Sequence, residues 1–268
     1  MPVTLKKSPI VELVAELNWD ILEQQFPGAN IGNGPSGIVI NQAECEEFFM
    51  MFSGEVNKLG FKKIERLFPH GMPLFSHQPI FRFRSENNDV LYQVGAGYFS
   101  VNATAGYKSW NDFSPVIEDG LNALLTARSG SDKLKPFSNV SLRYLDAFKE
   151  PLIQGMGIDK FMSEVLGINI SIPTGISNHI AKGETHRPSL QLQIPMKDKE
   201  VMLISIGEGM SGGNPAFLMD TNVVTNIETN ADVAEVMAVL NLSHNNIHNM
   251  FFEITKPIMA LMEPSEVN

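Results

Sequence analysis

An apolar stripe near the end of the chain constrains the fold more than any other feature. Between Ala231 and Met262, apolar side chains recur at spacings of three and four residues. The stripe consists of Val233, Met237, Leu240, Ile247, Phe251, Ile254, Ile258 and Leu261, with His244 filling one slot. This period predicts one long amphipathic helix, or two in line, packed along a core. Pro257 lies inside the pattern, so we expect a kink or a break near Glu253.

Several short stretches alternate apolar and polar side chains, which is the period of a half-buried strand. The predicted strands are residues 10–19, 80–84, 90–94, 98–102, 140–148, 190–194, 201–206 and 217–224. A helix is expected over residues 43–60. A second helix is expected from Ser114-Pro115, with Ser as the N-cap and Pro at the first helical position, to near Gly130. Residues 26–37 and 69–79 are rich in Pro with Gly or His, and we interpret them as loops.

The order of these elements predicts an α+β fold with two loosely similar halves. Each half would be an antiparallel sheet covered by a helix, and the chain would end in the long amphipathic helix. We expect the halves to be residues 1–150 and 151–268, with the joint between Leu152 and Thr174. One compact domain is the alternative.

Composition and charge exclude several classes of function. The chain has 268 residues, of which 43% are apolar and 19% charged, values typical of a globular protein with a sizeable core. Its formal net charge is −10, whereas proteins that bind nucleic-acid phosphates usually carry a basic surplus or a dense basic stripe. The densest basic clusters are Lys6-Lys7, Lys62-Lys63 and Arg82 with Arg84. Because these clusters are small, we expect no direct nucleic-acid partner.

The sequence also lacks the features of a membrane or secreted protein. No stretch has the ~20 consecutive apolar residues that a membrane-spanning helix needs. Glu12 and Glu16 interrupt the apolar residues that follow the N-terminal lysines, which argues against a signal peptide. The single cysteine, Cys45, permits no internal disulfide, and the glutamates beside it disfavour a reactive thiolate. We therefore expect a cytoplasmic protein.

Two motifs that suggest ligand chemistry have simpler structural interpretations. Residues 207–212 fit G-x-G-x-x-G, but dinucleotide binding needs a helix to begin at the third glycine. Because Gly213-Asn214-Pro215 and a strand pattern follow, we favour a mobile loop between strands.

His244 and His248 lie one helical turn apart and could hold a metal. His244 also occupies the apolar stripe, which favours a core histidine, so we predict no metal and no cofactor.

Arginines and carboxylates remain as candidate ligand contacts, because the sequence has no nucleophile elbow, P-loop or C-x-x-C pair. They lie in pairs on three predicted strands, as Glu12 with Glu16, Arg82 with Arg84, and Arg143 with Asp146. If these strands are neighbours, their polar faces form either a solvated salt-bridge surface or the wall of an anion-binding pocket. The first outcome is the commoner one, and such surface pairs contribute little stability.

A series of motifs runs through most of the chain. The motifs are Ser8-Pro-Ile-Val-Glu-Leu-Val-Ala-Glu-Leu-Asn-Trp19, Phe81-Arg-Phe-Arg84, Gln93-Val-Gly-Ala-Gly-Tyr-Phe-Ser-Val-Asn102, Tyr107-Lys-Ser-Trp110, Ser141-Leu-Arg-Tyr-Leu-Asp146, and His244 with Phe251-Phe252 before Ile254-Thr255. Together they resemble a sporadically distributed prokaryotic family of uncharacterised proteins, in which Asn often stands where this chain has Asp146. The resemblance implies a shared shape and assigns no catalytic residue. Gln93, Tyr107 and Trp110 lie in these motifs and complete our set of candidate ligand- or partner-binding residues.

Two functions of different class fit these observations. The favoured one is a non-enzymatic protein-binding subunit or regulator, whose partner is a protein encoded nearby. Its motivation is the missing catalytic signatures, together with the patchy occurrence of the resembled family, which is typical of toxin–antitoxin or phage-defence modules. A cleft or an edge strand would hold the partner, and an exposed sheet edge also makes a homodimer reasonable.

The alternative function is binding or hydrolysis of an anionic small molecule or nucleotide. Arg82, Arg84 and Arg143 would hold the anion, and Glu12 or Glu16 would bind a metal or act as a base. If the three arginines point to separate faces, this alternative fails.

Overall fold

The computed structural model describes residues 3–21, 42–69, 76–87, 89–104, 107–225 and 227–266. It has the α+β architecture that the sequence predicts, with open antiparallel sheets and helices packed against them. Chain contacts divide the protein into two compact units. Unit 1 comprises Met1–Glu12, Arg143–Val223 and Ser243–Asn268, and unit 2 comprises Leu13–Leu142 and Val224–Leu242. The predicted domains, residues 1–150 and 151–268, stay a prediction.

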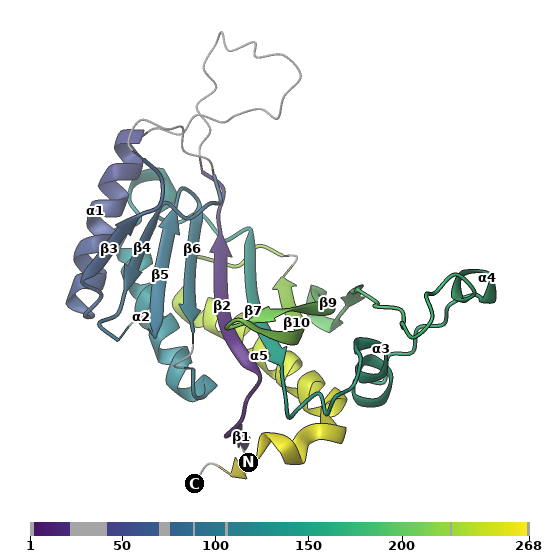
Figure 1. Cartoon of the computed structure of the whole chain (residues 1–268). Helices are drawn as coiled ribbons and strands as arrows, with labels where there is room; N and C mark the ends of the chain where they lie inside the picture. Colours follow the sequence, from purple (N-terminus) through teal and green to yellow (C-terminus); the bar gives the residue numbers. More distant parts are fainter. Residues whose placement is uncertain are drawn as a thin grey trace. The chain divides into compact units, whose positions relative to one another are not determined.

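Unit 2 is a sheet with two helices on one face (Figure 1). Its strand order is β3-β4-β5-β6-β2, and neighbouring strands are antiparallel. The strands are β3 (Lys63–Arg66), β4 (Phe81–Arg84), β5 (Val90–Gly95), β6 (Tyr98–Ala103) and β2 (Ile10–Asn18), of which unit 2 holds the residues from Leu13 onward. The helices are α1 (Gln42–Lys58) and α2 (Trp110–Ala127), and a short turn, η1 (Gly130–Asp132), follows them.

The core of unit 2 lies between the sheet and these helices. Phe52 of α1 packs its ring against three aromatic rings of the sheet. Its centroid lies 5.3 Å from that of Phe83, 6.3 Å from Tyr92 and 5.8 Å from Phe99. Because side chains alternate along a strand, the residues between these aromatics point to the opposite face of the sheet. That opposite face is polar, as described below.

Unit 1 repeats the order of a first strand, further antiparallel strands and a helix. The strand order is β7-β10-β9-β8. As in unit 2, the strand that comes first along the chain (β7) is the neighbour of the strand that comes last (β10). The strands are β7 (Asn139–Phe148, in unit 1 from Arg143), β8 (Leu190–Pro195), β9 (Glu200–Ser211) and β10 (Asn214–Thr225, in unit 1 to Val223). The core includes rings of Phe148, Phe161, Phe217 and Phe251, with neighbouring centroids 5.1 to 6.3 Å apart.

Short elements complete unit 1. Near the chain ends, β1 (Val3–Leu5) pairs antiparallel with β11 (Pro264–Glu266), which places the two ends side by side (Figure 1). The short helices and turns are α3 (Ile158–Lys160), η2 (Phe161–Val165, a π-helical turn), α4 (Thr174–Ser177), η3 (Lys197–Lys199) and η4 (Lys256–Met262).

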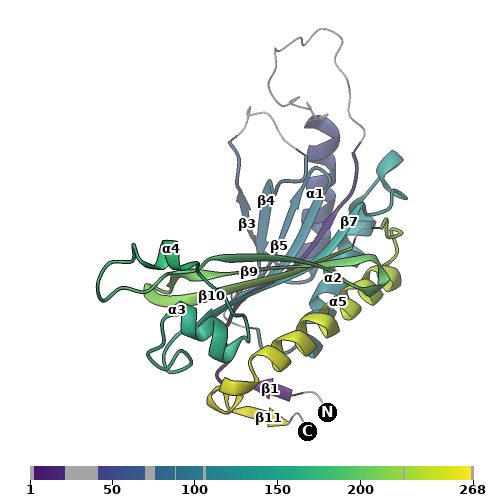
Figure 2. The same ribbon diagram turned by 90° about the vertical axis from the view of Figure 1, so that its right-hand side faces the viewer.

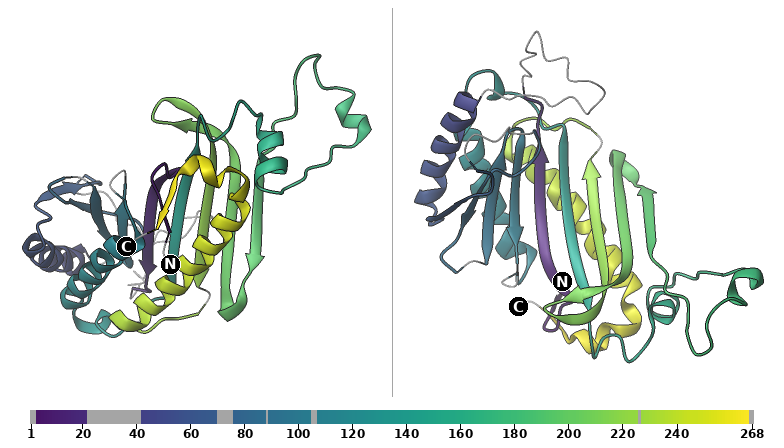
Figure 3. Two further views of the ribbon diagram at one scale, coloured as in Figure 1. Left: turned by 90° about the horizontal axis from the view of Figure 1, so that it is seen from below. Right: turned by 45° about the horizontal axis from the view of Figure 1, so that its top comes forward.

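The segment between η2 and β8, residues 168–189, forms a feature that we call the arm. In Figures 2 and 3 it extends away from the strands and helices of its own unit and carries α4 at its far end. No residue of the arm is buried, and Ile170 and Ile176 are 38% and 60% exposed. Its hydrogen bonds are local, as in Ile176 N to Pro173 O and Ile180 N to Ser177 O. The sequence did not predict this exposed arm.

The predicted closing helix exists and breaks where Pro257 requires. Helix α5 (Val233–Ile254) ends three residues before Pro257, and the 3-10 turn η4 continues from it (Figure 2). Leu240, Ile247 and Phe251 of the predicted stripe are buried, whereas Val236 takes the slot that we assigned to Met237. The buried residues are Val236, Leu240, Ser243, Ile247 and Phe251, so Ser243 takes the slot that we assigned to His244. His244 is half-buried at the edge of the stripe.

Two local predictions were wrong, and both have physical reasons. Helix α2 begins at Trp110 and not at Ser114, because the Ser109 side chain caps it by accepting a hydrogen bond from Asp112 N at 3.2 Å. The loop that we predicted over residues 207–212 is a strand as far as Ser211. Strand β9 runs to Ser211, and Gly212 and Gly213 make the two-residue turn into β10 with φ of 59° and 79°. Positive φ at both positions is what this turn requires and what glycine adopts easily. The predicted loop at 26–37 lies outside the described residues.

Candidate functional site

A row of polar side chains crosses the face of the unit 2 sheet opposite α1 and α2. The strand register places one residue from each of five strands side by side, in the order Glu65, Arg82, Gln93, Ser100 and Glu16. We call these five residues the polar row. Three of the sequence-predicted candidates, Glu16, Arg82 and Gln93, therefore lie on one face of one sheet. The alternation of each strand puts them there, since the residues on either side of them pack against α1 and α2.

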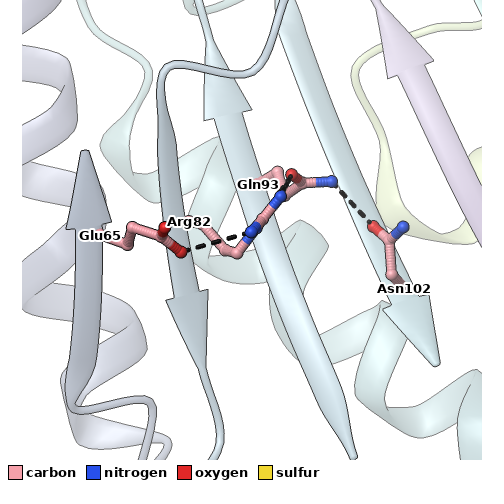
Figure 4. A network of polar contacts seen from close by, with 4 residues as sticks. All are labelled: Glu65, Arg82, Gln93 and Asn102. Carbon is pink, nitrogen blue, oxygen red and sulfur yellow. Dashed lines mark hydrogen bonds and ion pairs between the residues drawn. The ribbon is translucent and has the colours of Figure 1, made fainter. Parts of the chain in front are cut away.

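Hydrogen bonds connect the first part of the polar row (Figure 4). Arg82 Nη1 lies 3.3 Å from Glu65 Oε2, and Arg82 Nε and Nη2 both donate to Gln93 Oε1 at 3.3 Å. Gln93 Nε2 then donates to Ser100 Oγ and to Asn102 Oδ1, again at 3.3 Å. The amide of Gln93 thus accepts two hydrogen bonds and donates two, which is its full capacity.

The other end of the row is held in the same way. Glu16 accepts a hydrogen bond from Asn18 Nδ2 at 3.1 Å and one from Tyr98 OH at 3.3 Å. In the middle, Ser100 is fully buried and donates to Asn102 Oδ1 at 2.9 Å. Buried polar groups need such partners, because an unpaired one loses its hydrogen bonds to water. The row therefore satisfies itself, and a ligand would have to displace these contacts.

Arg84 lies on the same face of β4 as Arg82. It stands opposite Leu91 of β5 and Lys63 of β3, so a second cation and an apolar side chain are its cross-strand neighbours. Lys63 Nζ donates to Glu86 O at 3.2 Å. This corner of the sheet is locally basic, although Glu65 and Glu86 lie within it.

The remaining charged candidates belong to unit 1. Arg143 makes a bidentate pair with Asp220, in which Nε donates to Oδ1 at 2.8 Å and Nη2 donates to Oδ2 at 2.5 Å. Glu12 is counted with unit 1 and lies on strand β2, four residues before Glu16. The structure therefore gathers Arg82 and Arg84 on one face, while Arg143 has a carboxylate partner of its own.

Asp146 is a buried carboxyl group on the opposite face of β7 from Arg143. It is 4% exposed. Burial, together with the negative charge of Asp220, raises the pKa of Asp146 to about 7. At neutral pH the group is thus near half-protonation, unlike an ordinary aspartate.

Trp110 is the first residue of α2 in unit 2, and Tyr107 lies three residues before it. Both are half-exposed. Trp110 Nε1 donates to Asn241 Oδ1 at 2.7 Å, which ties this helix start to the first part of α5. Both aromatic rings contact Phe113, at centroid distances of 6.1 Å for Tyr107 and 6.4 Å for Trp110. These contacts give both residues a packing role.

A tyrosine–histidine pair in unit 1 was missed by sequence reasoning. Tyr144 OH lies 2.7 Å from His244 Nδ1, and the ring of His248 lies 5.6 Å from that of His244. Burial and the neighbouring His248 lower the pKa of His244 to about 4, and burial also lowers the pKa of His248. Both rings are therefore neutral at neutral pH. Within the described residues, no group of three or more His, Cys, Asp or Glu side chains gathers as a metal site would require.

Two further buried polar groups are structural ties. Glu200, at the start of β9 and 3% exposed, accepts hydrogen bonds from Ser243 Oγ at 2.8 Å and Asn246 Nδ2 at 2.7 Å. In unit 2, the Arg128 guanidinium lies 4.8 Å from the ring centroid of Trp19 and 5.1 Å from that of Phe137. Except for Arg128 with Phe137, these pairs join residues that lie tens of positions apart, so no local sequence signal could have revealed them.

Comparison with protein-family models and with curated proteins finds no match for this sequence. Among the helices of the described residues, none combines the length and the apolar character that crossing a membrane requires. Function must therefore be argued from the polar row, the two histidines and the exposed arm.

Proposed function

We propose that the protein is a non-enzymatic protein-binding subunit or regulator, with the arm and the edge strand β8 as its binding surface. The observation that carries this proposal is the exposed arm, whose isoleucines pack against no core. Burying an isoleucine side chain stabilises a complex by roughly 1.5–3 kcal/mol, so Ile170 and Ile176 together supply a useful anchor. Exposed apolar side chains gathered on one element are typical of binding surfaces.

Strand β8 extends this surface from the end of the arm. It is the last strand in the order of its sheet, and residues 191 and 193 to 195 are exposed. Such an edge offers backbone N–H and C=O groups to a partner strand, which would bind by β-augmentation. The arm would supply apolar anchors and β8 would supply directional hydrogen bonds.

The polar contacts support this function over the enzymatic alternative. Arg82 is already bound by Glu65 and Gln93, and Arg143 by Asp220. An anion-binding pocket would need these guanidinium groups to face a ligand. Within the described residues, the basic corner at Arg84 and Lys63 favours an anionic small molecule or nucleotide.

The motif resemblance suggests which partner and which cellular location to expect, and the proposal includes both. The partner would be a protein encoded nearby, in a toxin–antitoxin or phage-defence module, and the complex would be cytoplasmic. Membership in the resembled family and a homodimer are parts of the same proposal.

A comparison of two matched variants tests the proposal. Ile176→Asp places a carboxylate on the arm, and Leu134→Asp makes the same kind of change at a residue of unit 2 that is 84% exposed. The tagged protein and both variants are purified from native cells, and co-purified proteins are quantified by mass spectrometry. We expect one protein in near-stoichiometric amount with the parent and with Leu134→Asp, and its loss with Ile176→Asp.

The alternative is tested on the same purified material. Binding of inorganic pyrophosphate and of ATP is measured by calorimetry for the parent and for Arg84→Ala. If no protein co-purifies, and ATP binds and is hydrolysed in a manner that Arg84→Ala abolishes, the protein-binding proposal is wrong.

A further inference from the structure

A buried arginine at the end of α2 has hydrogen-bond donors without acceptors. Arg128 is the C-cap of α2 in unit 2 and is 2% exposed, and its Nη2 donates to Lys135 O at 2.7 Å. Its Nε and Nη1 are buried and meet no acceptor among the described residues. Burial lowers the pKa of Arg128 to about 10, so the guanidinium still carries its charge at neutral pH. A buried charge of this kind needs a partner of opposite sign.

The groups around Arg128 supply only part of that partner. The rings of Trp19 and Phe137 attract the cation, but an aromatic ring is a weak acceptor for an N–H donor. The C-terminal end of α2 favours a cation through the helix dipole, which amounts to a partial charge. Asp132 is the carboxylate whose charge acts on Arg128, and it already pairs with Lys135 Nζ at 2.8 Å. Within the described residues, the guanidinium therefore has no carboxylate of its own.

Two more buried donors without partners belong to the same part of unit 2. The ring of Trp19 lies 6.1 Å from that of Phe137, and its Nε1 has no acceptor in the described part of the chain. Thr229 exchanges two backbone hydrogen bonds with Phe137, at 2.7 and 2.9 Å, and its buried Oγ1 also has no partner there. The amide oxygens of Asn18 and Asn139 lack donors as well, but neither accepts a hydrogen bond from the guanidinium. We call Arg128, Trp19 and Thr229 the buried donor cluster.

We propose that the buried donor cluster binds one small inorganic anion with a single charge, such as chloride. The anion accepts hydrogen bonds from Arg128 and balances its charge, and Trp19 Nε1 and Thr229 Oγ1 are the further donors. A single negative charge matches the one guanidinium, and a small ion suits donors that are buried. The site lies within unit 2, so this inference does not depend on protein binding by the arm and β8.

The dependence of stability on chloride tests the site. Thermal unfolding of the full chain is followed by circular dichroism while chloride replaces gluconate, a much larger anion, at fixed ionic strength. An anion that binds only the folded protein raises the unfolding temperature as its concentration rises. We expect a rise of several degrees between about 1 and about 100 mM chloride, and no rise in Arg128→Met. Arg143→Met is the matched control and should keep the rise, because Arg143 has Asp220 as its partner.

Bromide quenching of fluorescence tests the geometry with Arg128 in place. The chain has two tryptophans, so Trp110→Phe leaves Trp19 as the reporter and Trp19→Phe leaves the half-exposed Trp110. A bromide ion bound beside Trp19 quenches its fluorescence by contact. We expect saturable quenching of Trp19 that chloride reverses. Trp110, which only collides with bromide from solution, should show quenching in proportion to the bromide concentration.

These measurements distinguish a bound anion from ordered water at the donors. If the unfolding temperature of the parent is the same in chloride and in gluconate, water alone serves the donors and the proposal is wrong. A chloride effect that persists in Arg128→Met places the anion elsewhere and also overturns the proposal. So does quenching of Trp19 that is absent or does not saturate. If Arg128→Met does not fold, the quenching of Trp19 decides the matter, because that measurement leaves Arg128 unchanged.

Discussion

Asp146 offers the sharpest test of the electrostatics of unit 1. The change is Asp146→Asn, which keeps the shape of the side chain and removes its ability to ionise. Asn is also the residue that the resembled family often has at this position. Because Asp146 is 4% exposed and lies near the charge of Asp220, its ionised form is disfavoured in the folded protein.

The size of the destabilisation by ionised Asp146 follows from its pKa. Folding raises the pKa of Asp146 from 3.8 to about 7, a difference of about 3 units. Each unit corresponds to ~1.4 kcal/mol, so ionised Asp146 destabilises the folded protein by on the order of 4 kcal/mol. A raised carboxyl pKa means that the folded state holds its proton more tightly than the unfolded state. The stabilising effect of that proton is fully present below pH 3.8 and is lost as pH rises to about 7.

The assay is urea unfolding of the parent and of Asp146→Asn from pH 4 to pH 8.5. The variant should match the parent near pH 4 and exceed its free energy of unfolding by several kcal/mol at pH 8. His244 changes stability with pH in the opposite direction. Folding lowers its pKa from 6.5 to about 4, so the folded protein loses stability as pH drops through that range. That effect is common to both proteins and cancels in the difference. A difference that stays constant across the pH range would show that Asp146 ionises normally and would refute the reasoning.

Three further predictions concern stability and are checked by urea unfolding near pH 7. Gly120→Ala should destabilise by about 1–3 kcal/mol, because the new Cβ would lie 2.6 Å from an aromatic carbon of the sheet. Gly54→Ala is the matched change in α1, where an added Cβ would have no heavy atom within 4 Å, and it should stabilise the protein by up to ~1 kcal/mol. Equal effects of the two substitutions would contradict the packing of α2 against the sheet. Gln93→Ala should cost about 1–3 kcal/mol by leaving buried partners unpaired, whereas the exposed Gln191→Ala should change little. Glu200→Ala should lose a similar 1–3 kcal/mol, and a neutral result would show that its two donors find other acceptors.

Periodicity predicted most of the elements, because it reports which side of an element faces the core. The stripe in α5 and the alternation in β2 and β7 are local patterns of this kind, and so is the break before Pro257. The start of α2 was misplaced because the cap is decided by which serine side chain reaches a free backbone N–H, and in the structure Ser109 does so.

Much of the candidate site could not be predicted, since it depends on strand register. That Arg82 and Arg84 share a face follows from their spacing on one strand. That Arg82 binds Gln93, and Arg143 binds Asp220, depends on which strands are neighbours and on how they are aligned. A shift of one residue would turn every side chain of a strand to the other face.

Hydrogen–deuterium exchange of the arm tests the central claim most directly. The measurement follows the arm and strand β8 (Leu190–Pro195) in the purified protein, and again in any complex recovered from native cells. Protein binding through the arm and β8 predicts fast exchange in the purified protein and slower exchange in both segments once a partner protein is bound. Equal, fast exchange of the arm in the purified protein and in every recovered complex would contradict the account.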